Sequence, residues 1–150
     1  MKIQINKATV ENYNDIKSLF DRNQQACPEW DEISEYGLVA LDNDKLIGYI
    51  WACIGDSKAA YISHLVVDRD HRVKDDTMGR SLVALSLGAR MFEDLSKLGI
   101  TRAVATIQDN QIGDILAETY KKIGFSLIQC KYIARGNPSV ISDNLKRFRI

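Results

Sequence analysis

The 150-residue sequence contains few histidines, cysteines, prolines and glycines, and these shortages exclude several kinds of protein. Two histidines, His64 and His71, and three cysteines, Cys27, Cys53 and Cys130, include no closely spaced pair. A structural zinc site takes about four such ligands at short spacing, so we expect no metal site. An odd number of dispersed cysteines is typical of reduced thiols that pack as small hydrophobic side chains. With two prolines and nine glycines, the sequence also lacks a low-complexity linker.

Net charge and long apolar runs are absent as well. The 20 basic and 20 acidic residues give a formal net charge of zero, so no electrostatic footprint for nucleic acid or a membrane surface is expected. No segment approaches the length of a membrane span, and residues 1–13 lack the apolar core of a secretory signal. Hydrophobic residues make up 45% of the chain, enough for one globular domain over residues 1–150. We therefore expect a cytoplasmic protein with neither a nucleic-acid nor a membrane partner.

Hydrophobic periodicity predicts the order of strands and helices. Strands are expected where apolar residues alternate or run continuously, and helices where they recur every three or four positions. The predicted strands cover residues 2–8, 36–41, 46–54, 59–67, 102–107 and 125–134. The predicted helices cover residues 12–23, with Asn12 as the cap, 77–98 and 112–122. Residues 28–37 are predicted as a short helix or a loop, and the tail after Gly136 as a last edge strand or a short helix.

This order of elements predicts a mixed α+β fold. The turn at residues 42–45 joins its two flanking strands into an antiparallel hairpin. The long helix at 77–98 lies between the strands at 59–67 and 102–107, which implies that these two strands are parallel. We expect about four helices packed on a mostly antiparallel sheet of six or seven strands.

One strand–loop–helix segment, "VVDRDHRVKDDTMGRS" at residues 66–81, has features of a phosphate-binding turn. Gly79 and the small Ser81 lie at the start of the longest predicted helix, where free N–H groups and the helix dipole favour an anion. Glycine also permits a phosphate to approach the backbone closely. A polar loop that leads into a helix would show much of the same composition, so the residues alone leave both interpretations open.

The same segment resembles the GNAT superfamily of acetyl-CoA-dependent N-acetyltransferases. "VVDRDHR" follows the family's strand-end pattern through Arg72, with Arg69 in the place of the usual proline. "DTMGRS" resembles the family's pyrophosphate signature at Gly79 and Ser81, after an insertion, but Asp76 replaces a basic or amide residue. Positive charge from Arg72, Lys74 and Arg80 would compensate for this aspartate.

A second segment, "AETYKKIGF" at residues 117–125, resembles another block of the family. Tyr120, Lys122, Gly124 and Phe125 match at the family's mutual spacing, while Thr119 replaces a leucine. An asparagine that is common in the family is absent from its usual position, although Asn110 lies nearby.

The resemblance implies a GNAT-like fold in which the fourth and fifth strands splay apart and acetyl-CoA enters the gap. Backbone groups at the end of the fourth strand would pair with the pantetheine arm, and the N–H of Val66 would polarise the thioester carbonyl. The turn from Thr77 to Ser81 would hold the pyrophosphate. The implied acetyl-CoA-binding residues are Leu65, Val66, Val67, Arg72, Lys74, Thr77, Met78, Gly79, Arg80, Ser81, Asn110 and Tyr120.

The resemblance also suggests residues for proton transfer. Tyr120 would be the general acid for the leaving thiolate, and the alternative is a tyrosine that only packs under the sheet. The fourth strand lacks the carboxylate that the family often uses as a base. Ser63 could hold a water molecule, and His64 titrates in a suitable range but would alternate to the opposite face from Ser63. A purely structural histidine is the alternative for His64.

The acceptor would be a small-molecule or peptide amine. Four carboxylates in the stretch 28–37, those of Glu29, Asp31, Glu32 and Glu35, would suit a cationic amine, and a solvated acidic loop is the alternative. The sequence does not decide whether the protein forms a homodimer. The alternative to an enzyme is a non-catalytic relative that binds acyl-CoA or a protein partner. Three features favour this alternative: Asp76, the insertion and the missing strand carboxylate. We expect an N-acetyltransferase, chiefly because Tyr120 matches the family's acid.

Overall fold

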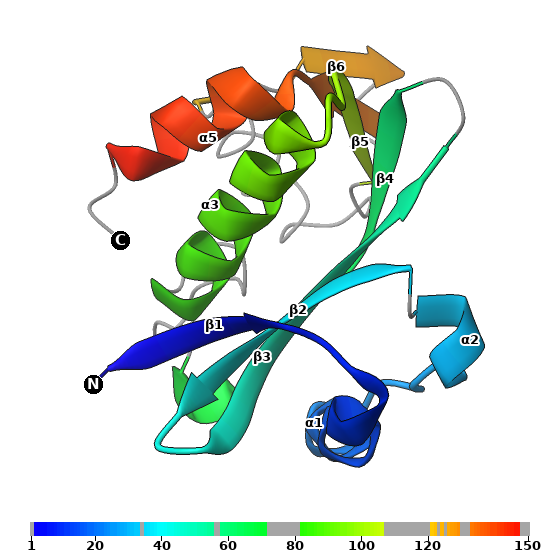
Figure 1. The fold of residues 1–150 in the computed structure, drawn as a ribbon, viewed down its shortest axis with the longest axis vertical. Coiled ribbons are helices and arrows are strands. Elements are labelled where there is room, and N and C mark those ends of the chain that lie inside the picture. The colour runs from blue at the N-terminus through cyan, green and yellow to red at the C-terminus, as the bar shows by residue number, and fades with distance from the viewer. Residues whose placement is uncertain are drawn as a thin grey trace.

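Seven strands form one mostly antiparallel sheet in the order β1-β2-β3-β4-β5-β7-β6 (Figure 1). This computed structural model describes residues 2–33, 35–55, 58–71, 82–106, 121–122, 124, 126–129 and 133–147. The strands are β1 Ile3–Lys7, β2 Tyr36–Asp42, β3 Lys45–Ile54, β4 Ala59–Val67, β5 Arg102–Thr106, β6 Ser126–Gln129 and β7 Ile133–Gly136. The helices are α1 Tyr13–Arg22, α2 Trp30–Ile33, α3 Leu82–Lys97 and α5 Pro138–Lys146, with 3₁₀ turns η1 Val10–Asn12 and η2 Arg69–His71. The mixed α+β fold predicted from the element order is confirmed.

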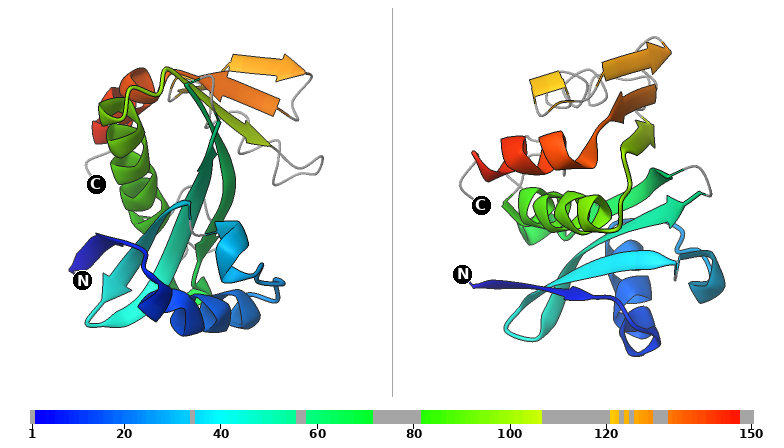
Figure 2. Two further views of the ribbon diagram at one scale, coloured as in Figure 1. Left: turned by 45° about the vertical axis from the view of Figure 1, so that its right-hand side comes forward. Right: turned by 45° about the horizontal axis from the view of Figure 1, so that its top comes forward.

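Helices cover both faces of the sheet (Figure 2). On one face lie α3 and α5, and α3 turns a stripe of buried residues at intervals of three or four positions toward the strands. On the other face α1 and α2 pack over a second core that includes Phe20, Ile33 and the aromatic pair Tyr49 and Trp51. The central strands β3 and β4 are thus held between two apolar layers. None of the helices in the described ranges has the length and apolar character that crossing a bilayer requires.

The β2–β3 hairpin forms as its turn residues predict. Asn43 and Asp44 both have positive φ, 48° and 66°, which matches the two-residue turn that suits the twist of paired strands. Asparagine and aspartate tolerate this left-handed conformation better than other non-glycine residues. Strand β4, predicted over residues 59–67, is observed as Ala59–Val67.

The first helix begins differently from the prediction. Asn12 was expected to cap it, but Asn12 has helical φ and ψ and its side chain makes no capping bond to the helix. The turn η1 runs directly into α1, and the extended residue that precedes both is Thr9. The Asn12 side chain instead accepts a hydrogen bond from the Thr9 N–H at 2.8 Å. The cap therefore lies three residues earlier than the apolar pattern suggests.

The carboxyl-terminal third differs most from the expectations. The single strand predicted over residues 125–134 is wrong, because two antiparallel strands, β6 and β7, occupy this region. The tail after Gly136 forms helix α5, the second of the two predicted alternatives, with Pro138 in its first turn and the Asn137 side chain accepting from the Ser139 N–H. The long helix predicted over 77–98 is described from Leu82 and is followed by Gly99 at φ 79°. Of the helix predicted over 112–122, only residues 121–122 lie in the described part, and they are helical.

Candidate active site

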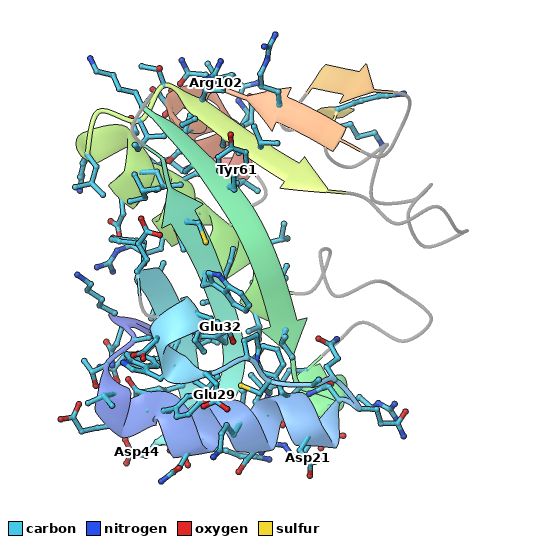
Figure 3. The ribbon with its side chains drawn as sticks, turned by 90° about the vertical axis from the view of Figure 1, so that its right-hand side faces the viewer. Asp21, Glu29, Glu32, Asp44, Tyr61 and Arg102 are labelled. Atoms are coloured by element: carbon cyan, nitrogen blue, oxygen red, sulfur yellow. The ribbon has the colours of Figure 1, made fainter. Side chains whose placement is uncertain are left out.

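The two parallel strands β4 and β5 are paired only over their first residues (Figure 3). Their register runs from Ala59 opposite Arg102 to Ile62 opposite Ala105. Beyond Ile62, β4 continues to Val67 and stays paired with β3 as far as the Gly48–Val67 pair, but no described residue of β5 pairs with it. The splay expected between the fourth and fifth strands is therefore confirmed.

A bulge in β4 lies where the two strands part. Trp51 pairs with His64 and the next residue, Ala52, pairs with Ile62, so Ser63 is an extra residue without a partner on β3. Such a bulge bends a strand and increases its local twist, which fits the separation that begins at the same point. The expectation that Ser63 and His64 lie on opposite faces concerns side chains that lie outside the described part of the structure.

The ladder between β3 and β4 determines which backbone groups of β4 remain available. The N–H of Asp68 donates to the carbonyl of Ile47 at 2.8 Å, just beyond the Gly48–Val67 pair. Because antiparallel pairs alternate between hydrogen-bonded and non-hydrogen-bonded positions, Val66 also directs its polar groups toward β3. Leu65 then directs its N–H and C=O groups to the other edge, which β5 has left. This edge of β4 is a template for an extended ligand.

The end of β4 is also firmly packed. The side chain of Val66 belongs to the core under α1, and that of Val67 belongs to the core under α3. Both residues are fully buried. The available edge groups are therefore carried by a strand that is held from both faces.

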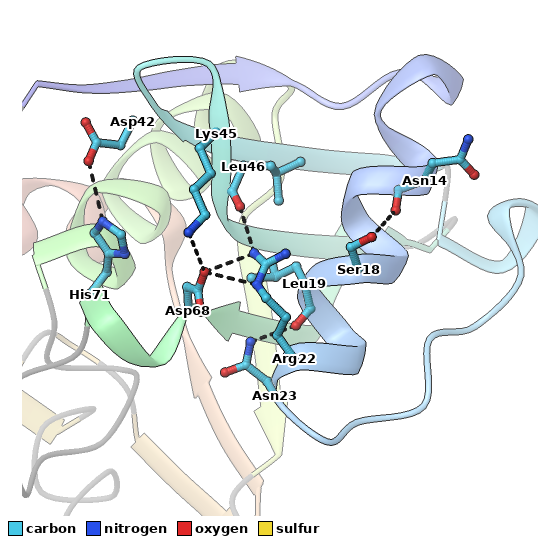
Figure 4. Close-up of polar contacts among 10 residues, drawn as sticks. All are labelled: Asn14, Ser18, Leu19, Arg22, Asn23, Asp42, Lys45, Leu46, Asp68 and His71. Carbon is cyan, nitrogen blue, oxygen red and sulfur yellow. Dashed lines mark hydrogen bonds and ion pairs between the residues drawn. The ribbon is translucent and has the colours of Figure 1, made fainter.

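A polar network holds the residues just after β4 (Figure 4). The Asp68 carboxylate accepts hydrogen bonds from Nε and Nη2 of Arg22, at 3.2 and 2.9 Å, and Lys45 Nζ lies 3.8 Å from the same oxygen. Arg22 Nη2 also donates to the carbonyl of Leu46 at 3.1 Å. The sequence analysis missed this network, because nothing in the sequence pairs a helix-terminal arginine with an aspartate 46 positions later.

The segment around α2 forms a wall beside β3. Tyr13 donates a hydrogen bond to the carbonyl of Pro28 at 2.7 Å, and its ring lies 5.8 Å from that of Trp30. Burial is the main cause that raises the pKa of the Tyr13 phenol. Tyr61, opposite Cys53 in the β3–β4 register, is half exposed and lies on the sheet face that α2 covers.

Two of the four predicted acidic residues on this wall already accept backbone hydrogen bonds. Glu32 accepts from the N–H of Glu29 at 2.8 Å, and Glu35 accepts from the N–H of Ile54 at 3.0 Å. Figure 3 shows Glu32 on α2 and Glu29 just before this helix. All four carboxylates, including that of Asp31, belong to exposed residues. Their arrangement is compatible with both a cationic acceptor and a solvated surface.

Most of the other predicted site residues lie outside the described part of the chain. Leu65, Val66 and Val67 are the predicted acetyl-CoA-binding residues that the structure describes. The predicted site residues outside the described ranges are Arg72, Lys74, Thr77, Met78, Gly79, Arg80, Ser81, Asn110 and Tyr120. Within the described ranges, no group of three or more His, Cys, Asp or Glu side chains is placed to hold a metal ion.

A cavity of about 420 Å³ lies elsewhere, between α3 and the edge strand β1. It is lined by Ile3, Ile5, Leu82, Ser86, Ala89, Arg90 and Glu93. No residue of β4 or β5 contributes to this cavity, so it is separate from the strand divergence.

Comparisons with solved structures agree with this fold. The ribosomal-protein-S18-alanine N-acetyltransferase from Escherichia coli superimposes with a TM-score of 0.73 at 13% identity, covering 91% of this chain and 94% of that one. PaiA N-acetyltransferase from Thermoplasma acidophilum, solved in complex with coenzyme A, gives 0.65 at 17% identity, over 91% and 99% of the two chains. Arabidopsis thaliana Naa50, in complex with a bisubstrate analogue, gives 0.70 at 17% identity over the same shares. At such identities these likenesses establish the fold alone.

Sequence comparison identifies the family. No curated protein matches the chain. The profile of the acetyltransferase (GNAT) family, however, matches residues 8–125, which include β2 to β5, the segment 66–81 and the Tyr120 block. The observed fold, with its splayed strands β4 and β5, is consistent with this match. The chain therefore belongs to the GNAT acetyltransferase family.

Proposed function

We propose that the protein transfers the acetyl group of acetyl-CoA to a primary amine by direct attack, within one GNAT domain over residues 1–150. The observation that carries this proposal is the edge of β4 beyond Ile62, where Leu65 presents backbone groups that β5 does not use. The amide groups of a pantetheine arm match such an edge, because they donate and accept as a neighbouring strand would. Family membership supplies the reaction class.

The register changes one detail of the expected mechanism. Val66 directs its N–H toward β3, so the proposal assigns the N–H that polarises the thioester carbonyl to Leu65. A backbone donor held in a buried strand is already oriented for the negative charge that develops on the carbonyl oxygen. In the reaction the amine nitrogen bonds to the carbonyl carbon, the carbon–sulfur bond breaks, and the sulfur takes up a proton.

The remaining roles follow from the family resemblance. Tyr120 donates the proton to the departing sulfur, since a phenol with an ordinary pKa of about 10 is protonated at neutral pH. The turn from Thr77 to Ser81, just before α3, holds the pyrophosphate, with Arg72, Lys74 and Arg80 providing positive charge. The amine must lose a proton, and Ser63, through a water molecule, and His64 are the candidates for accepting it.

The acceptor is proposed to be a cationic amine that approaches along the α2 wall. The exposed carboxylates of Glu29, Asp31, Glu32 and Glu35 support this proposal, because they would attract positive charge to this face. Candidate acceptors are polyamines, lysine side chains of peptides and aminoglycosides.

The test of the proposed function has two stages. Thermal unfolding is first measured with and without acetyl-CoA, and a ligand that binds only the folded state must raise the midpoint. Release of free CoA thiol is then measured against a panel of cationic, neutral and anionic amines. Thiol release that depends on a cationic amine supports the proposal. Binding of acetyl-CoA without release against any amine would favour a non-catalytic acyl-CoA-binding relative, and no binding would reject both.

A further inference from the structure

A half-exposed aromatic residue lies beside the point where β4 and β5 part. Tyr61 directly precedes Ile62, the last residue of β4 with a described partner on β5. It is 50% exposed and lies on the sheet face that carries α2, the face of the acidic wall. A tyrosine offers a ligand an apolar ring with a hydroxyl at its rim. Tyr61 is therefore placed to contact an acceptor that approaches the strand divergence.

The strand register places an arginine on the same face as Tyr61. Tyr61 pairs with Val104 of β5, and Val104 pairs with Arg135 of β7. Directly paired residues share one face of a sheet, so these three side chains form a row across the strands. Neighbouring strands are about 4.8 Å apart, which separates the Cα atoms of the outer two residues by about 10 Å. The long Arg135 side chain can reach a ligand that rests on the Tyr61 ring.

The glycine that follows Arg135 supports this direction. Gly136 pairs with Ala103, a member of the core under α3. A Cβ atom at Gly136 would lie 2.7 Å from Ile141 Cδ1 on α5, so position 136 faces the helices α3 and α5. Successive residues of a strand point to opposite faces, which directs Arg135 away from these helices. Arg135 is accordingly exposed.

Charges of opposite sign lie on the two sides of Tyr61. Figure 3 shows Tyr61 between Arg102 of β5 and Glu32 of α2. Arg135 lies on the same side of Tyr61 as Arg102, because β5 and β7 follow β4 in the sheet. A ligand with one positive and one negative end matches this separation, whereas a ligand with positive charge at both ends meets repulsion from the arginines.

We propose that Tyr61 and Arg135 form an acceptor subsite that selects a primary amine carrying a carboxylate. The amine lies toward the thioester and the acidic wall, the carbon chain rests on the Tyr61 ring, and Arg135 binds the carboxylate. A guanidinium suits this role because its planar fork donates two parallel hydrogen bonds to a carboxylate. This inference rests on the proposed function and narrows its acceptors, since it disfavours polyamines and aminoglycosides.

The spacing of the strands also limits the length of the acceptor. The proposed function places the thioester at Leu65, four positions beyond Tyr61, which is about 10–13 Å at about 3.3 Å per residue. Arg135 lies on the other side of Tyr61. The reacting amine and the carboxylate must therefore be several bonds apart, as in ω-amino carboxylates and in lysine at the carboxyl end of a peptide. An α-amino acid that reacts at its α-amine is too short.

The experiment measures kcat/KM by CoA thiol release for three acceptors that share the reacting amine and differ at the far end. ε-Aminocaproate carries a carboxylate, ε-aminocaproamide a neutral amide, and hexamethylenediamine a second ammonium group. Exposed ion pairs contribute up to about fivefold and hydrogen bonds to charged groups at least about tenfold, so the carboxylate should exceed the amide by about five- to tenfold. The diamine should be the poorest of the three. β-Alanine should show no such advantage over β-alaninamide.

Variants assign the preference to the two residues. Arg135→Gln should bring the carboxylate and the amide to within about twofold of each other. Arg147→Gln is the matched control, because Arg147 is an exposed arginine just after α5, on the opposite side of the sheet, and it should keep the wild-type ratio. Tyr61→Leu should raise KM for both acceptors alike, and Tyr61→Phe should retain wild-type values because the ring remains. A peptide ending in lysine, compared with ε-aminocaproate, distinguishes a peptide from a free amino carboxylate as the source of the two groups.

Three results would overturn the inference. The first is a wild type that uses the carboxylate no better than the amide or the diamine, and the second is a folded Arg135→Gln variant that keeps the wild-type ratio. The third is an equal loss of the ratio in Arg147→Gln. If Arg135→Gln does not fold, Arg135→Lys takes its place: it keeps the charge without the fork, and an undiminished ratio there is equally decisive. Thiol release without a carboxylate preference rejects this inference alone, whereas no release with any amine rejects the proposed function and the inference with it.

Discussion

The close contact between α3 and β3 at Gly48 predicts that Gly48→Ala lowers the stability of the protein, by an amount that can be estimated from interatomic distances. A Cβ atom at Gly48 would lie 2.8 Å from Val83 Cγ1 and 2.9 Å from Leu87 Cδ1. Nonbonded carbon atoms prefer separations of about 3.5–4.0 Å, so the added methyl group overlaps both side chains. Val83 and Leu87 are fully buried, so neither side chain can turn away into solvent. Gly48→Ala is therefore expected to displace these side chains and to strain the packing of α3 on the sheet.

The magnitude follows from two opposing terms. Overpacking of this kind costs about 1–3 kcal/mol. Replacing glycine by alanine also restricts the unfolded chain, which offsets about 0.4–1 kcal/mol of that cost. The net loss is then roughly 0–2.6 kcal/mol, and its central value of about 1.3 kcal/mol corresponds to a decrease in Tm of roughly 3–5 °C for a chain of this size.

Gly88 in α3 provides the control, because the same substitution there has the opposite expected sign. The nearest atom to a Cβ at Gly88 is Leu145 Cδ1 at 3.7 Å, an ordinary contact. Alanine is favoured over glycine in a helix interior by about 0.8–1 kcal/mol, so Gly88→Ala should stabilise the protein. Urea unfolding followed by circular dichroism measures both variants. Gly48→Ala at or above wild-type stability, with an unchanged denaturant slope, would refute the packing argument.

Three further predictions concern the proposed site and the titration of a buried phenol. Gly79→Glu should weaken acetyl-CoA binding, because it adds a like charge where the proposal places the pyrophosphate, and unchanged affinity in the folded variant would locate the phosphates elsewhere. Tyr120→Phe should lower turnover by about 10²–10⁴-fold while the acetyl-CoA Kd stays within a few-fold, and wild-type turnover with chemistry rate-limiting would leave Tyr120 as a packing residue. Burial and the hydrogen bond to Asp94 raise the pKa of Tyr36 to about 12 from a reference of 10.0, so its contribution to stability is full below pH 10 and is lost as the pH rises toward 12. Tyr36→Phe should reduce this alkaline loss in unfolding experiments, and an identical pH profile for the two proteins would contradict the assignment.

The sheet from β1 to β5 could be predicted because its sequence signals are local. Short windows of sequence identify each element. Alternating apolar residues indicate the strands, Asn43–Asp44 indicates the hairpin turn, and apolar residues at every third or fourth position indicate α3. Strands β4 and β5 are then predicted to be parallel, because a helix connects one to the other. The division between β6 and β7 could not be predicted, because two consecutive apolar strands without a glycine or proline turn resemble one longer strand.

The details that shape the candidate site have weaker signals. A bulge at Ser63 adds one residue to an otherwise regular strand, and neither hydrophobicity nor composition reveals it. The Asp68–Arg22 contact joins residues that are far apart in sequence, and it depends on how α1 docks against β4. The outward direction of the backbone groups of Leu65 depends on the register with β3, which the sequence does not specify.

The central claim is that acetyl-CoA binds along the edge of β4 that β5 leaves free. Residue-resolved hydrogen exchange of backbone amides, measured by NMR with and without saturating acetyl-CoA, tests it most directly. The account predicts that the Val66 amide, paired with β3, is protected in both samples, whereas the amide of Leu65 becomes protected only when acetyl-CoA is present. A Leu65 amide that is already protected in the free protein, or that remains unprotected with saturating acetyl-CoA, would contradict it.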